Sequence, residues 1–234
     1  MSDTLISIPK YNLPHIAMNC HFNVGISLLS SLDLIIEYMQ KIENPSEDFI
    51  LLGNAITNCN LQNSINITKK LKINILSIDE AEHTFKKLMK VIYEKIPKNI
   101  IQYWDASDDF NDEIDKKLTI HQLIHKYQPQ YFICNIQDFN TVLDIKSSLI
   151  HVRNFNINPL NENQRTKINY NLHAVVVYYN HHFFITYCVG NEWLVRDCIP
   201  HKPINILYKN IHDYVGKITE RNYVHSFACY VKNV

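Results

Sequence analysis

The hydrophobic periodicity of the chain changes between its two halves, and this change limits the folds that it can adopt. In the first half, apolar residues recur at helical spacing over 24–39 and again over 81–96, and a proline follows each stretch. The second of these helices is predicted to begin near Ser77 or Asp79, where a capping box fits. A third, short helix is predicted over 119–127.

The second half instead carries short runs of β-branched and aromatic residues, separated by Asn, Pro and Gly. Helices first and strands later, without βαβ alternation, predict an α+β fold rather than a doubly wound α/β sheet. A length of 234 residues is typical of a single domain with a sizeable core. The predicted strands are 131–134, 148–152, 173–179, 183–189, 192–195 and 227–231.

Charge and composition exclude several classes of function. The formal net charge is zero and no long basic run occurs, so we expect no nucleic-acid partner. No apolar stretch approaches the roughly 20 residues of a membrane span, and the first residues do not resemble a secretion signal. We therefore expect an intracellular protein, cytoplasmic or nuclear, with no membrane partner. The Asn, Ile and Lys bias is typical of AT-rich genomes, including viral and parasitic ones, for which the location would be the host cell.

The six cysteines include no C-x-x-C pair, so neither a structural zinc site nor a disulfide framework is predicted. One cysteine, Cys20, stands where the first helical pattern begins. The helix dipole and the unpaired N–H groups of a first turn favour a thiolate, and they also stabilise an oxyanion. Cys20 is therefore a candidate nucleophile. The alternative is a buried structural cysteine, the commoner fate of a single thiol.

A candidate base and its orienting acid lie in the β-rich half. His182 precedes an aromatic residue on a predicted strand, and Asp197 follows 15 residues later, a spacing that suits a hairpin returning to the same end of a sheet. His181 and His173 are rival bases, and neighbouring strand residues face opposite sides, so only one of His181 and His182 can face the thiol. The alternative interpretations are that His182 is an exposed loop residue and that Asp197 lies in a surface turn. The order Cys…His…Asp is that of papain-like thiol proteases.

Several segments resemble, in the same order, the motifs of ubiquitin-specific proteases, a papain-like class of deubiquitinases. The nucleophile box N-T-C-Y-x-N is similar to Asn19-Cys20-His21-Phe22-Asn23, with His21 in place of the tyrosine. The box that carries the catalytic histidine is similar to His181-His182-Phe183, and the W-x-x-F-D-D box is similar to Trp193-Leu194-Val195-Arg196-Asp197-Cys198. Further likeness lies at 79–88 (a thumb helix), 149–155, 170–178 (Y-x-L-x-A-V-V-V-H) and 227–231 (the final strand).

The resemblance implies a fold with a helical thumb over 1–100, a reduced finger-like region over 101–147 and an antiparallel β palm over 148–234. It implies a thiol hydrolase, active without metal or cofactor, that cleaves the bond after the C-terminal Gly of ubiquitin or a ubiquitin-like modifier. Cys20, His182 and Asp197 take the catalytic positions, and His15 stands where the family has its oxyanion Asn. We expect a monomer.

Two other functions fit the same sequence. One is a papain-like peptidase or transferase with a different protein substrate, in which His173 is the base. The other is a catalytically dead pseudoenzyme that binds ubiquitin without cleaving it.

Overall fold

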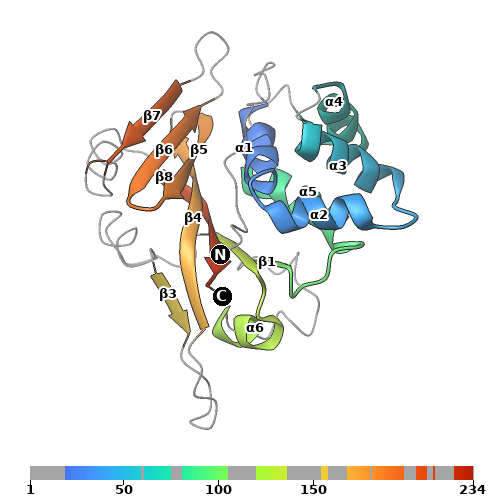
Figure 1. Cartoon of the computed structure of the whole chain (residues 1–234). Coiled ribbons are helices and arrows are strands. Elements are labelled where there is room, and N and C mark those ends of the chain that lie inside the picture. The colour runs from blue at the N-terminus through green and yellow to red at the C-terminus, as the bar shows by residue number, and fades with distance from the viewer. Residues whose placement is uncertain are drawn as a thin grey trace.

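In a computed structural model of the chain, a group of helices lies on one side of a single twisted sheet (Figure 1). This arrangement confirms the predicted α+β class. The structure describes residues 19–58, 61–74, 81–104, 120–135, 154–157, 168–179, 181–197, 204–209, 213 and 224–233.

The helical stretch predicted over 24–39 is two helices rather than one. The chain breaks between Leu29 and Asp33, where the hydroxyls of Ser30 and Ser31 donate to the carbonyls of the last turn and Leu32 has non-helical dihedrals. Such hydroxyls compete with the backbone for hydrogen bonds, so the apolar spacing continues across a real helix end. The helices are α1 (Cys20–Leu29), α2 (Asp33–Lys41), α3 (Glu47–Asn58), α4 (Leu61–Lys70), α5 (Ala81–Tyr93) and α6 (Ile120–Tyr127).

The strands form one sheet in the order β1-β2-β8-β4-β5-β6-β7, and β3 also pairs with β4. Neighbours are antiparallel, except that β1 and β2 are parallel. The strands are β1 (Ile101–Trp104), β2 (Tyr131–Asn135), β3 (Asn154–Ile157), β4 (Ile168–Tyr179), β5 (His182–Val189), β6 (Glu192–Asp197), β7 (Ile204–Tyr208) and β8 (Val224–Lys232).

Five of the six predicted strands are confirmed as β2, β4, β5, β6 and β8, and the sixth, 148–152, lies outside the described residues. Helices α3 and α4 and strands β1, β3 and β7 were not predicted. Strands β1 and β2 belong to the 101–147 range, and they join the sheet through β8.

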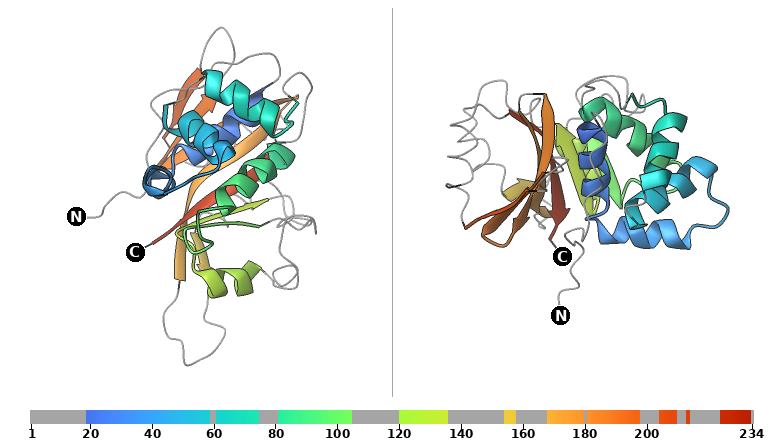
Figure 2. Two further views of the ribbon diagram at one scale, coloured as in Figure 1. Left: turned by 90° about the vertical axis from the view of Figure 1, so that its right-hand side faces the viewer. Right: turned by 90° about the horizontal axis from the view of Figure 1, so that it is seen from above.

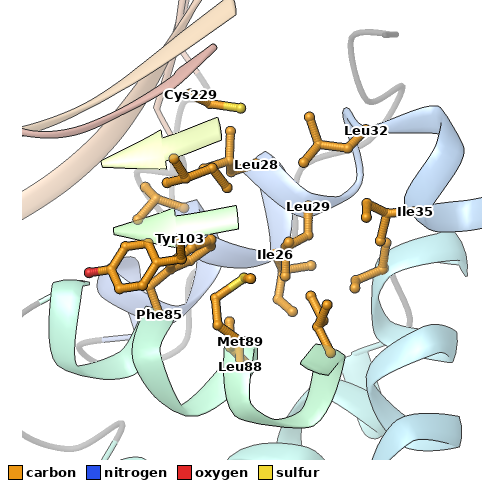
Figure 3. Close-up of a cluster of buried hydrophobic side chains, with 14 of the residues drawn as sticks. Ile26, Leu28, Leu29, Leu32, Ile35, Phe85, Leu88, Met89, Tyr103 and Cys229 are labelled. Carbon is orange, nitrogen blue, oxygen red and sulfur yellow. The ribbon is translucent and has the colours of Figure 1, made fainter. Parts of the chain in front are cut away.

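Helix α1 is enclosed between the sheet and the other helices, as the view from above shows (Figure 2). All ten of its residues are buried, as expected for a helix covered on every side. Figure 3 shows Phe85, Leu88 and Met89 of α5 beside Ile26 and Leu29 of α1. The position of α1 is therefore set by two partners, the sheet and α5.

The opposite face of the sheet has its own core, built around Tyr170, Phe132 and Trp193, against which Ile124 of α6 packs. Among the described helices, none has the length and apolar character needed to cross a membrane.

Candidate active site

Cys20 is the first residue of α1 and is buried, with 4% of its surface exposed. The backbone N–H groups of Phe22 and Asn23 donate to the Asn19 carbonyl at 3.0 and 2.9 Å and so form the first turn. This turn, described in full, contains no acidic residue, so no side chain within it opposes the positive end of the helix dipole. A helix start of this kind is a common position for nucleophilic cysteines.

His182 and Asp197 meet at one end of the sheet. His182 is the first residue of β5, Asp197 is the last residue of β6, and the antiparallel register of these strands brings both to the same end. The His182 Nε2 and Asp197 Oδ1 atoms are 2.5 Å apart. His182 also shares a hydrogen bond with Cys20. The imidazole therefore lies between the thiol and the carboxylate.

The charge state of His182 follows from these contacts. Burial lowers its pKa, but the hydrogen bonds to Asp197 and Cys20, together with the electrostatic interactions with both residues, outweigh burial and raise the pKa to about 9. At neutral pH the imidazole is then protonated. A histidine in contact with a cysteine is the usual arrangement for activating a thiol nucleophile.

The two rival histidines lie elsewhere. His181 is exposed in the turn before β5, with a positive φ of 62°, and its Nδ1 atom lies 3.1 Å from the Tyr178 hydroxyl. His173 is buried on β4, and its Nε2 atom is 2.8 Å from the Ser31 hydroxyl, beyond the C-terminal end of α1. At ~1.5 Å per residue, Cys20 and Ser31 are separated by roughly 15 Å along α1. His173 is therefore remote from Cys20, whereas His181 contacts Tyr178.

The buried position of His173 gives a prediction about stability. Burial lowers the pKa of His173 from 6.5 to about 4, so between these values the unfolded chain binds a proton that the folded protein does not. The free energy of unfolding should therefore fall by about 3 kcal/mol as the pH drops from 6.5 to 4, at ~1.4 kcal/mol per pKa unit.

Urea unfolding at several pH values measures this fall. His173→Gln is the matched control, because its amide takes the place of Nε2 toward Ser31 and does not titrate. Other groups titrate equally in both proteins, so the difference between the two profiles isolates His173. Parallel profiles for the two proteins would show that His173 contributes nothing.

Other expectations concern His15, metals and disulfides. His15 lies outside the described residues, as do Cys59 and Cys198. The described cysteines, Cys20, Cys134, Cys188 and Cys229, carry thiols rather than disulfides. In the described part of the chain, no group of three or more His, Cys, Asp or Glu side chains is arranged to hold a metal ion.

Two polar contacts near Cys20 were not predicted. The Asn19 and Asn23 carboxamides pair with each other, at 3.3 and 3.5 Å. The His21 Nδ1 atom is 2.8 Å from the Thr84 hydroxyl of α5. A signal for the second contact exists in the sequence, since Thr84 interrupts the apolar face that Phe85 and Leu88 form on α5.

Comparison with known proteins identifies the fold. The sequence matches no family model and no curated protein. Several solved structures are similar, all at low sequence identity. One is the SAGA Ubp8/Sgf11/Sus1/Sgf73 DUB module bound to ubiquitin aldehyde, with a TM-score of 0.57 and 10% identity over 100% of this chain and 72% of that chain.

Two further structures of this module are similar. The module bound to monoubiquitin has a TM-score of 0.55 and 10% identity, over 95% of this chain and 69% of that chain. A yeast SAGA DUB module with a mutant Sgf73 has a TM-score of 0.57 and 10% identity, over 99% and 70%. The chain therefore has the papain-like fold of ubiquitin-specific proteases.

Proposed function

We propose that the protein is a deubiquitinase that hydrolyses the isopeptide or peptide bond after the C-terminal Gly of ubiquitin or a ubiquitin-like modifier. The observation that carries this proposal is the position of His182, in hydrogen-bond contact with both Cys20 and Asp197. The fold adds support, because two of the similar structures described above are of a DUB module bound to ubiquitin or ubiquitin aldehyde. Ubiquitin as substrate also agrees with the expected intracellular location.

In the proposed mechanism, the Cys20 thiolate attacks the carbonyl carbon of the terminal Gly and forms a tetrahedral oxyanion. The backbone N–H of Cys20, at the start of α1, is a candidate donor to this oxyanion, with His15 as a second candidate. When the intermediate collapses, the C–N bond breaks and the His182 imidazolium gives its proton to the departing amine. A thioester between ubiquitin and Cys20 remains.

Hydrolysis completes the cycle. The neutral imidazole of His182 takes a proton from a water molecule, whose oxygen attacks the thioester carbonyl. The C–S bond then breaks, ubiquitin leaves with a free carboxylic acid that loses its proton to solvent, and the thiolate–imidazolium pair is restored. Asp197 holds the ring orientation and stabilises the imidazolium in both steps. None of these steps requires a metal or an organic cofactor.

A ubiquitin probe with a thiol-reactive group at its C-terminus tests the proposal. The expected result is stoichiometric labelling of Cys20, identified by mass spectrometry of the digested adduct. Cys188→Ala is a suitable control protein, because Cys188 is a half-exposed thiol at the other end of β5.

Two other results of the probe experiment would contradict the proposal. Ubiquitin binding without labelling would indicate the pseudoenzyme. If the protein neither binds ubiquitin nor reacts with the probe, but Cys20 still reacts with a small alkylating agent, the result would indicate a peptidase or transferase with another protein substrate.

A further inference from the structure

Helix α1 presents neighbouring residues to different partners near its start. Successive helical residues are turned by about 100°, so Cys20 and His21 point in different directions. Cys20 contacts His182 of the sheet, whereas His21 contacts Thr84 of α5. One helical turn beyond His21, the two helices approach closely, since a Cβ atom added at Gly25 would lie 3.0 Å from the Leu88 Cδ1 atom.

The contact between His21 and Thr84 has a defined geometry. The two side chains are fully buried and are joined by a 2.8 Å hydrogen bond between residues 63 positions apart. Apolar packing is non-directional and tolerates small sliding or rotation of one helix on another. A buried hydrogen bond does not, because displacement leaves a desolvated polar atom without its partner.

The far end of α1 is held separately. The Tyr187 hydroxyl donates to the Ser27 carbonyl at 2.9 Å, and His173 bonds Ser31. Loss of the contact at His21 would therefore remove a directional contact from the first turn of α1, which begins with Cys20, while the hydrogen bonds between the far end and the sheet remain.

We propose that the His21–Thr84 hydrogen bond is a positioning contact, which holds the first turn of α1 so that the Cys20 thiol faces the His182 imidazole. It acts through Cys20 and does not touch the substrate. The inference rests on the proposed function only in taking Cys20 as the nucleophile, and it is tested on the thiol itself, without ubiquitin.

The test measures the rate at which iodoacetamide alkylates Cys20 between pH 5.5 and 9, with the site assigned by mass spectrometry. Thr84→Val keeps the shape of the side chain but removes the hydroxyl, and we expect alkylation of Cys20 near neutral pH to slow by about tenfold, since small misplacements of catalytic groups have effects of this size or larger. Thr84→Ser retains the hydroxyl and should restore the rate to within about threefold of the original protein.

Thr68→Val is the matched control. Thr68 is also buried, at 2% exposure, but its hydroxyl donates to the Ile65 carbonyl at 2.8 Å within α4. Its substitution should leave the alkylation profile of Cys20 unchanged. Equal slowing by Thr68→Val and Thr84→Val would overturn the proposal, because it would show a general loss of stability. An unchanged rate in Thr84→Val would overturn it directly.

A second pair of variants serves if Thr84→Val does not fold. Asn at position 21 places a polar atom where Nδ1 lies, whereas Gln places one where Nε2 lies. We expect His21→Asn to react faster than His21→Gln, and equal rates would overturn the proposal. If Thr84→Val slows alkylation but the original protein neither cleaves nor binds ubiquitin, the positioning contact stands and the proposed function fails.

Discussion

Cys20→Ala should reduce hydrolysis of a fluorogenic ubiquitin substrate by at least about a thousandfold, because removal of a catalytic nucleophile leaves only the contributions of binding and oxyanion stabilisation. The loss should lie in kcat. The substitution removes one sulfur atom at the start of α1 and leaves the packing of the helix in place, so the far-ultraviolet circular dichroism spectrum should not change. The variant should still bind ubiquitin, which calorimetry would measure.

The control for this experiment is Cys188→Ala, which removes a thiol from the same sheet at the end remote from His182. Its turnover should stay within about twofold of the original rate, as for most substitutions away from a functional site. Residual turnover above about one part in a thousand in Cys20→Ala would place the nucleophile elsewhere in the chain.

The sequence predicted the α+β class that the structure has, and it also selected the three residues that the structure brings together at one end of the sheet. Cys20 was selected because a thiol at a helix start has a distinctive electrostatic setting. In the structure, α1 does begin at Cys20. The pairing of His182 with Asp197 follows from the spacing of two strands in one hairpin, which is a local property of the chain.

The resemblance favoured His182 over His173, but the physical difference between the two histidines lies in the tertiary structure. Both precede or lie within β-rich runs, and nothing in the spacing reveals that β4 carries His173 to the far end of α1. The break at Ser30 and Ser31 was missed for a related reason. The apolar residues continue at helical spacing across the break, because α2 also faces the core, as the buried Ile35 shows.

The contact between His21 and Thr84 also depends on tertiary structure. It joins two helices 63 residues apart, and no local pattern in either helix specifies the other. A buried polar residue on an apolar face, as at Thr84, signals that a partner exists but does not identify it.

His182→Ala should lower the turnover of a ubiquitin substrate by several orders of magnitude, because the residue donates a proton in the first half of the proposed reaction and accepts one in the second. Two histidine variants serve as comparisons. His181→Ala removes an exposed side chain from the adjacent turn and should keep turnover within about twofold. His173→Ala should destabilise the protein by about 2–4 kcal/mol, as expected for truncation of a buried, hydrogen-bonded ring, but should retain turnover while folded.

Asp197→Asn separates the orienting role of Asp197 from that of the base. The hydrogen bond and the negative charge of Asp197 help to raise the pKa of His182 to about 9, so removing the charge should lower this pKa. Turnover needs the imidazolium as proton donor to the leaving amine, and it is lost as the pH rises through the pKa of His182. The alkaline limit of the pH–rate profile should therefore move down from about 9 toward 6.5. A smaller loss of kcat than in His182→Ala should accompany this shift. An unchanged alkaline limit in Asp197→Asn would show that Asp197 does not control the pKa of His182.

Loss of turnover in His181→Ala or His173→Ala, with near-full turnover in His182→Ala, would assign the base to a different histidine.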